Sequence, residues 1–214
     1  MSIKIKRLTE NFAAEINDVN LCEKISVRDF SDIKTAFEEY SILVFPNQPL
    51  TDEQQVAFSQ RFGDLENTIN SKQQGGAGKP VTVLTNVGKN GEVIAPEDRR
   101  MVFNTGNQMW HTDSSFKPIP AMMSLLSGRE VPPEGGETEF ASMRAAYEDL
   151  DNDQKSELEQ LICVHDFAYS RSLIDTSLLD REDKYELPPV RQAVIRKNPT
   201  NHRKNLFLGA HASY

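Results

Sequence analysis

Short strand-like runs recur along the chain, and turn-favouring residues separate several of them; the run SILVFPN is β-branched and apolar. These runs lie at 41–47, 81–87, 121–128, 137–143 and 190–196. Runs of this length between turn signals are typical of strands in an antiparallel sandwich or barrel. Residues 1–20 alternate loosely and predict an opening pair of strands. The pattern therefore favours a fold with a β-sheet framework.

Helical spacing interrupts this pattern in two places. From Ser26, which suits an N-cap, apolar residues recur at intervals of three and four, and a second helix is predicted over 51–62. There Thr51 and Gln54 can form a capping box. Two further helical pieces are predicted within 142–162. Helices that come early and in one insertion among many strands indicate an α+β chain, and 1–214 is predicted to be a single domain.

Composition narrows the function classes. The 214 residues carry a net charge of −8, and the sequence pI is near 5.1, which argues against general affinity for nucleic acid or for a membrane surface. Cys22 and Cys163 are too few and too far apart for a disulfide framework or a Cys-type zinc site. No signal peptide and no apolar run of membrane-spanning length is evident, so we expect a cytoplasmic protein.

The stretch WHTDSSF at 110–116 contains a candidate metal site. On an extended strand His111 and Asp113 would project to the same side, because side chains two apart share a face. An imidazole and a carboxylate that converge supply two ligands of the 2-His-1-carboxylate triad of non-haem iron enzymes. The spacing alone also fits a zinc site or a surface histidine bonded to a carboxylate. Trp110 and Phe116 are predicted to be core residues beside the site.

Longer stretches resemble one enzyme family. NQMWHTDSSF and the following AMMSLLSGREVPPEGGETEFASMRAAYEDL closely resemble the TauD/TfdA family of Fe(II)- and 2-oxoglutarate-dependent dioxygenases. SILVFPNQPLTDEQQVAFSQRFGDLE and LFLGAHAS resemble it too, and the likeness is nearer to the 2,4-dichlorophenoxyacetate dioxygenase branch. The resemblance implies a double-stranded β-helix, or jelly roll, with N-terminal helices and a helical insertion.

The resemblance also implies the site and its chemistry. His111 and Asp113 would bind Fe(II), Thr138 would bond a carboxylate of 2-oxoglutarate, and Asn107 would lie beside co-substrate and substrate. Ser114 is a further candidate for bonding a substrate carboxylate. Oxidative decarboxylation of 2-oxoglutarate by O2 would yield succinate and CO2 while a small anionic substrate is hydroxylated. In the favoured branch, hydroxylation beside an ether oxygen gives an unstable hemiacetal that breaks into a phenol and an oxoacid, a reaction of aromatic compound catabolism.

The family's remaining iron ligand has no match in the chain. The resemblance places a distal histidine, and an arginine for 2-oxoglutarate, later than Tyr214. We therefore expect 1–214 to be a C-terminally truncated, incomplete domain that lacks closing strands and is inactive alone. Among the other histidines, His165 is expected to be an ordinary, partly buried residue at the end of the helical insertion, His202 to face solvent, and His211 to pack beside the site.

Several alternatives remain open at this level. A non-catalytic jelly-roll binding protein is the second hypothesis, and a metallohydrolase is a third. The substrate could be an aryloxyalkanoate, another carboxylate, a sulfonate or an alkyl sulfate. Residues 95–106 lack periodicity and predict a loop over the site. The candidate substrate cations are Lys79, Lys89, Arg99, Arg100 and Lys117. A homo-oligomer is neither indicated nor excluded.

Overall fold

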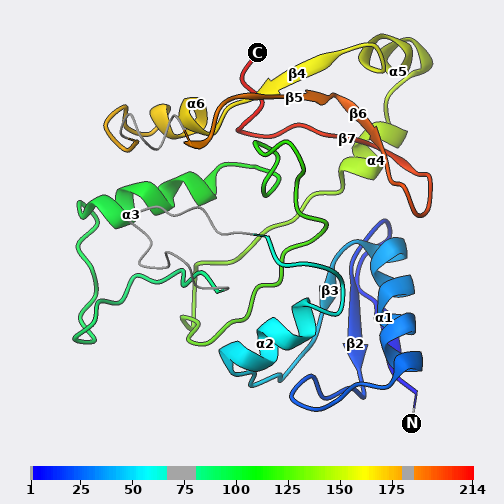
Figure 1. The fold of residues 1–214 in the computed structure, drawn as a ribbon, viewed down its shortest axis with the longest axis vertical. Helices are drawn as coiled ribbons and strands as arrows, with labels where there is room; N and C mark the ends of the chain where they lie inside the picture. Colours follow the sequence, from blue (N-terminus) through cyan, green and yellow to red (C-terminus); the bar gives the residue numbers. More distant parts are fainter. Residues whose placement is uncertain (1, 67–80, 180–185) are drawn as a thin grey trace. The chain divides into compact units, whose positions relative to one another are not determined.

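The computed structural model describes residues 2–66, 81–179 and 186–214 (Figure 1). Helices and strands are mixed along this chain, which confirms the predicted α+β class. The chain divides into two units. The first unit comprises Met1–Asp64, Leu125–Asp149 and Lys197–Asn205, and the second comprises Leu65–Ser124, Leu150–Arg196 and Leu206–Tyr214. The prediction of a single domain over 1–214 stays a prediction.

A three-stranded sheet opens the first unit. Strands β1 (Lys4–Arg7) and β2 (Ala14–Asn17) pair antiparallel, and β3 (Leu43–Val44) pairs parallel with β2. The predicted opening strand pair is therefore confirmed. The run at 41–47 contributes a strand of two residues only. In β2, Ala14 and Ile16 are buried while their neighbours are partly exposed, as the period of two in a strand requires.

Two capped helices follow the predictions closely. Helix α1 (Val27–Tyr40) begins after Ser26, whose hydroxyl accepts a hydrogen bond from the Asp29 amide at 3.0 Å. Helix α2 (Asp52–Ser59) begins after Thr51, which forms the expected capping box with Gln54. It ends three residues earlier than predicted. These caps depend on neighbouring residues only, so the sequence could reveal them.

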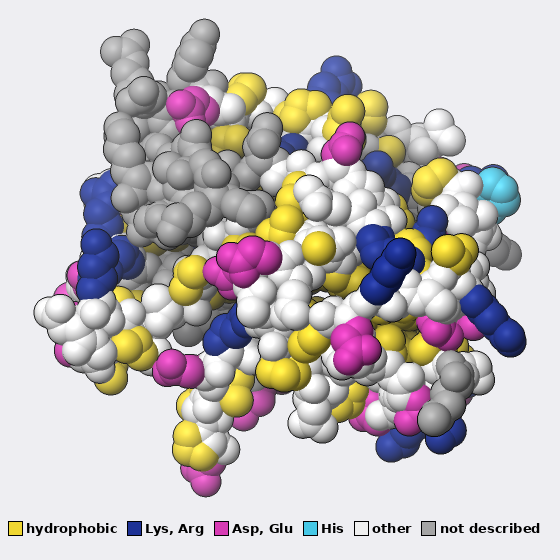
Figure 2. Space-filling view, turned by 60° about the horizontal axis from the view of Figure 1, so that its bottom comes forward, with side chains coloured by type: hydrophobic (Ala, Val, Ile, Leu, Met, Phe, Trp, Pro, Cys, Tyr) yellow, Lys and Arg dark blue, Asp and Glu magenta, His cyan; other side chains and the backbone are white. Residues whose placement is uncertain are grey.

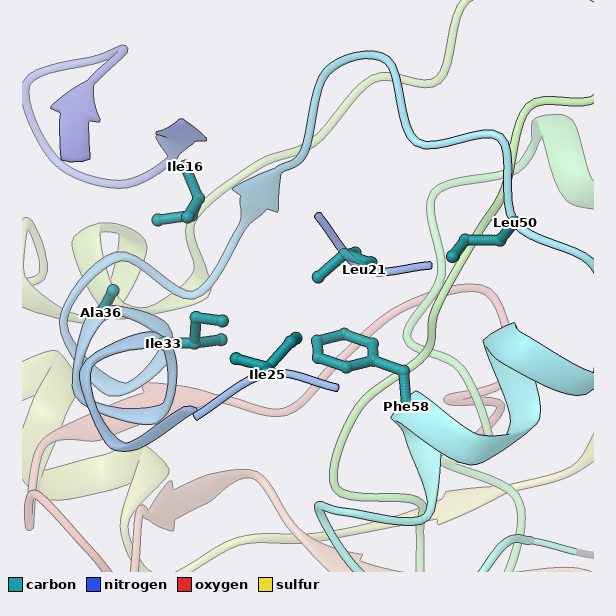
Figure 3. Packing of buried hydrophobic residues seen from close by; sticks show 7 residues of the cluster. All are labelled: Ile16, Leu21, Ile25, Ile33, Ala36, Leu50 and Phe58. Atoms are coloured by element: carbon teal, nitrogen blue, oxygen red, sulfur yellow. The ribbon is translucent and has the colours of Figure 1, made fainter. Parts of the chain in front are cut away.

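The core of the first unit lies between α1, α2 and β2. Figure 3 shows its side chains, which are Ile16, Leu21, Ile25, Ile33, Ala36, Leu50 and Phe58. Ile16 and Ile33 are almost wholly buried, and burying one such side chain stabilises a fold by about 1.5–3 kcal/mol. Phe58 also packs edge-on against Phe62, with ring centroids 5.4 Å apart.

A buried arginine holds the C-terminal end of α1. Arg144, in α4 (Met143–Glu148), donates from Nη1 to the Glu38 carbonyl at 2.9 Å and from Nη2 to the Glu39 carbonyl at 2.7 Å. The last carbonyls of a helix have no partner within the helix, and a cation there also interacts well with the helix dipole. Arg144 therefore joins α1 to α4.

Replacing Arg144 should destabilise the chain. Arg144→Met keeps the length of the side chain but removes two part-buried hydrogen bonds, at a cost of about 0.5–1.5 kcal/mol for each bond. The Glu38 carbonyl keeps its second donor, Asn201, whereas the Glu39 carbonyl loses the donor that Arg144 provides. Urea unfolding of both proteins should show a lower midpoint for the variant. An unchanged midpoint would mean that water replaces the guanidinium without loss.

The second unit contains an antiparallel pair, β4 (Ile162–His165) with β5 (Val190–Ala193), drawn as adjacent arrows in Figure 1. The predicted strand near 190–196 is thus confirmed, and it continues as β6 (Ile195–Lys197), which pairs with β7 (Lys204–Leu206). The two predicted helical pieces are confirmed as α4 and α5. Helix α5 spans Asn152–Leu158, and the described part of the chain also contains α6 (Phe167–Ser172), α3 (Arg99–Asn104) and the 3-10 helix η1 (Thr105–Gln108).

Four predictions about secondary structure were wrong. The runs at 81–87, 121–128 and 137–143 are not strands. The one β-type pairing between residues 81 and 143 is an isolated bridge from Val87 to Val93. A strand requires a partner at the right register, which local composition does not reveal. The segment predicted as a loop at 95–106 instead contains α3 and η1, and Asp98 caps α3.

The surface mixes side-chain types. On the face in Figure 2, Lys and Arg side chains are interspersed with Asp, Glu and hydrophobic ones. Several large apolar side chains of the described residues are well exposed, among them Val27, Ile119 and Val131. Within the described ranges, no helix is long and apolar enough to span a membrane.

Candidate metal centre

The second unit brings His111 and Asp113 together. The His111 Nε2 atom lies 3.3 Å from Asp113 Oδ1. The predicted meeting of the two side chains is correct, but its reason was not, because 110–116 does not form a strand. A turn starts at Asp113 instead, and Ser114 adopts a left-handed backbone with φ 57°. The turn brings the carboxylate back toward the imidazole.

One hydrogen bond determines which nitrogen of His111 is directed at Asp113. Nδ1 lies 2.7 Å from the Met109 carbonyl oxygen, which can only accept, so Nδ1 carries a hydrogen and donates. Nε2 then faces Asp113. The hydrogen bond with Asp113 raises the pKa of His111, against the opposing effect of burial. Metal-binding histidines commonly donate their second N–H to a backbone carbonyl in this way.

Asp113 is held in the same manner. The Ser124 hydroxyl donates to Asp113 Oδ2 at 2.6 Å, and Oδ1 faces His111. The hydrogen bond with His111, aided by the one from Ser124, lowers the pKa of Asp113. The group is therefore a carboxylate at neutral pH, with one oxygen held by a neighbour and the other directed at the imidazole.

The segment around Gly209 supports the backbone of this motif. The Ala210 amide donates to the Trp110 carbonyl at 2.9 Å, and the Thr112 hydroxyl lies 3.4 Å from the Leu208 carbonyl. Gly209 has φ +155°, and a Cβ there would approach the His111 Cα to 3.0 Å. Only glycine suits both the conformation and the close approach.

His211 packs beside the motif, as predicted. Its ring centroid lies 4.8 Å from that of Phe116, 5.6 Å from that of Phe167 and 6.1 Å from that of His111. The Ser170 hydroxyl donates to the Phe167 carbonyl, so it accepts from His211 Nδ1–H at 2.9 Å. Burial, with smaller effects from nearby charges, lowers the pKa of His211 to about 4. His211 is therefore neutral at pH 7.

This neutral histidine should make stability depend on pH. The unfolded chain binds a proton at His211 near pH 6.5, whereas the folded chain does so only near pH 4, so acidification favours unfolding between these values. From pH 7.5 to 5 the loss from this group should be about 2 kcal/mol. Urea unfolding at both pH values should show a drop that is smaller by that amount in His211→Asn.

The exposed His202 provides the control for this measurement. His202→Asn should retain the full drop, since the side chain is open to solvent and asparagine tolerates its φ of 60°. Equal drops in the original chain and in His211→Asn would contradict the assignment of a neutral, buried His211.

The other predicted site residues are exposed or form hydrogen bonds with other groups. Asn107 lies exposed in η1, and the Ser114 hydroxyl donates to Glu66 Oε2 at 2.6 Å. Thr138 is exposed and belongs to the first unit, whereas the metal motif belongs to the second. Phe116 is buried as predicted, but Trp110 is 59% exposed, so its assignment to the core was wrong.

Several of the candidate substrate cations already have partners within the chain. Lys79 lies outside the described residues, Lys117 pairs with Glu66, and Arg100 pairs with Asp98. Arg99 donates to two carbonyls at 177–178.

His202 is exposed, as predicted. His165 is not at a helix end but on β4, fully buried, and stacked on Phe207 at 5.4 Å between centroids.

Sequence reasoning missed two residues near the motif, Ser124 and Arg171. Ser124 lies in the middle of the run at 121–128, and Arg171 is one of several arginines, so neither residue carried a signal. Arg171 is buried in α6, where its guanidinium lies over the rings of Phe103 and Phe167. Burial lowers the pKa of Arg171, but an arginine remains charged.

The donor set suits a divalent metal ion. An imidazole nitrogen and a carboxylate oxygen converge, and each ligand side chain is oriented by a second hydrogen bond. No group of three or more His, Cys, Asp or Glu residues that could hold a metal is found in the part of the chain that the structure describes. His111 and Asp113 could therefore supply two ligands of a site, and no third residue of these types joins them among the described residues.

Comparisons with known proteins agree with this chemistry. The profile of the family described as "Taurine catabolism dioxygenase TauD, TfdA family" matches residues 4–214. The alpha-ketoglutarate-dependent 2,4-dichlorophenoxyacetate dioxygenase of Cupriavidus pinatubonensis is 38% identical, over 100% of this chain and 76% of the relative. The (S)-phenoxypropionate/alpha-ketoglutarate-dioxygenase of Sphingobium herbicidovorans is 34% identical, over 97% and 71%.

A solved structure is similar as well. The crystal structure of AAD-2 in complex with Mn(II) and N-oxalylglycine is 41% identical in sequence and superimposes with a TM-score of 0.87. The alignment covers 99% of this chain and 73% of that one.

Proposed function

This chain belongs to the TauD/TfdA family of 2-oxoglutarate-dependent dioxygenases, and on this premise we propose that it hydroxylates a small aryloxyalkanoate. Enzymes of this family use Fe(II), 2-oxoglutarate and O2. The proposed products are succinate and CO2 from the co-substrate and, after the hemiacetal breaks down, a phenol and an oxoacid. Two relatives whose names specify aryloxyalkanoate substrates support this choice.

The pairing of His111 with Asp113 is the observation that carries the proposal. Bound Fe(II) would supply the activation of O2 that the oxidation of a C–H bond requires. His111 would bind it through Nε2, because Nδ1–H is engaged by the Met109 carbonyl. Asp113 would bind through Oδ1 while Ser124 holds Oδ2. The same two hydrogen bonds orient the His111 and Asp113 side chains.

The remaining site residues are proposed from the family resemblance and the residue types. Thr138 would donate its hydroxyl to a carboxylate of 2-oxoglutarate, and Asn107 would lie beside co-substrate and substrate. Ser114 would bond a substrate carboxylate after exchanging its present partner, Glu66. The exposure of Asn107 and Thr138 supports an ability to reach a small molecule. The proposed framework around them is a jelly roll, which the likeness to solved dioxygenases supports.

Turnover with a set of anionic substrates tests the proposal. The full-length protein should form succinate and a phenol from an aryloxyacetate only when Fe(II) and 2-oxoglutarate are both present. His111→Ala should lower the rate by more than about 100-fold, since removing residues that merely orient a ligand already costs about 10–100-fold. Succinate and phenol are measured together, so that co-substrate turnover without hydroxylation is detected.

The control and the competing outcomes are specific. His202→Asn replaces an exposed histidine away from the motif and should keep the full rate. Turnover with an alkyl sulfate or a sulfonate but not with aryloxyacetates would refute the substrate class. Metal and 2-oxoglutarate binding with no succinate from any substrate would favour the non-catalytic alternative. Full turnover by His111→Ala would refute the metal assignment.

A further inference from the structure

Arg171 has an unusual environment for a buried cation. It is 7% exposed, and its guanidinium carbon lies 4.7 Å from the ring centroid of Phe103 and 4.9 Å from that of Phe167. Nη1 donates to the Phe103 carbonyl at 3.4 Å, while Nε has no hydrogen-bond partner within the described chain. Among the described residues Arg171 forms no ion pair with a carboxylate. Burying a charge in this way is costly, so the local packing must retain the side chain for another reason.

The missing side chain of Gly106 provides the space for this guanidinium. A Cβ on Gly106 would lie 1.3 Å from Arg171 Nη1 and 2.6 Å from Arg171 Cζ. The backbone of Gly106 does not have the positive φ that would by itself require glycine. An alanine at this position would therefore require the Arg171 guanidinium to move, and glycine lets the guanidinium lie directly on the backbone of η1.

A short chain of contacts connects this seat with His111. Gly106 accepts a hydrogen bond from the Met109 amide at 3.3 Å, and the Met109 carbonyl in turn accepts from His111 Nδ1 at 2.7 Å. Phe103, whose carbonyl accepts from Arg171, lies at the other side of Gly106 in α3. The guanidinium therefore contacts the turn at Gly106 and the end of α3 that leads into it.

We propose that Arg171 is a positioning residue for His111. Its guanidinium packs against Gly106 and bonds the Phe103 carbonyl, and so it holds the η1 turn whose Met109 carbonyl orients the imidazole. This inference rests on the proposed function, because it concerns the same metal ligand. Arg171 touches neither metal nor substrate in this arrangement and acts through the backbone.

Manganese binding to the metal-free protein provides the test. Free Mn(II) is followed by electron paramagnetic resonance as protein is titrated, which measures affinity without turnover. Arg171→Met, which removes the planar donor but keeps an unbranched apolar chain, should weaken Mn(II) binding about tenfold, as expected for an outer residue that orients a ligand. Arg171→Lys keeps the charge but not the planar group that stacks on the rings. Its Mn(II) affinity should therefore lie between that of the original chain and that of Arg171→Met.

Arg144→Met provides a matched control. Arg144 is 9% exposed, also donates to backbone carbonyls, and lies in the first unit. It should lose stability yet bind Mn(II) with the original affinity. If Arg144→Met weakened Mn(II) binding as much as Arg171→Met, the effect would reflect general destabilisation, and the positioning proposal would fail.

Gly106→Ala tests the proposed contact from the other side. In the original chain it should weaken Mn(II) binding about tenfold, because the added methyl displaces the guanidinium. In the Arg171→Met background, Gly106→Ala should weaken Mn(II) binding much less, because the guanidinium that the methyl would displace is gone. This non-additivity of the two changes would show that Gly106 and Arg171 are directly coupled. Equal losses in both backgrounds would overturn the proposal. This comparison still decides the matter if Arg171→Met alone folds poorly, because Arg171→Lys can replace it as the background.

The outcomes separate this proposal from the proposed function. One outcome is that His111→Ala abolishes Mn(II) binding while Arg171→Met leaves it unchanged. That outcome would overturn the positioning of His111 by Arg171 but would still support the metal site. A higher KM for the anionic substrate with unchanged Mn(II) affinity would make Arg171 a substrate contact and would also overturn the proposal. Failure of the original chain to bind Mn(II) would overturn both.

Discussion

The hydrogen bond from His111 Nδ1 to the Met109 carbonyl is the interaction on which the candidate site depends. It occupies one nitrogen and turns the other toward Asp113, so a single backbone carbonyl determines both the tautomer and the direction of the ring. Asp113 is held in a parallel way by Ser124. Each side chain thus uses one polar atom to hold its position and presents the other.

Two buried arginines stabilise the chain by different physical means. Arg144 donates to two of the last carbonyls of α1 with a planar fork of donors, so its desolvation is offset by two hydrogen bonds to the helix end. Arg171 makes one long hydrogen bond and relies on the faces of two aromatic rings. The first arrangement stabilises a helix end, whereas the second constrains the backbone ahead of the metal motif.

Local and non-local features differed in how well the sequence predicted them. The caps at Ser26 and Thr51 depend on residues within three positions, and both were predicted correctly. Strand formation at 81–87 and 121–128 depends on a partner elsewhere in the chain, and there the prediction was wrong. Helix α3 was missed because it is short and buries only Phe103, which leaves too little periodicity to detect.

By itself, the sequence determined the α+β class, the starts of α1 and α2 and the likeness to a dioxygenase family, because these follow from short-range patterns and from long matched motifs. It also indicated that His111 and Asp113 meet. Only the tertiary structure decided how they meet, through a turn at Asp113 instead of a strand, and which groups hold them. Ser124, Gly209 and Arg171 act there across 11 to 98 positions of sequence, and such contacts arise from folding, not from local pattern.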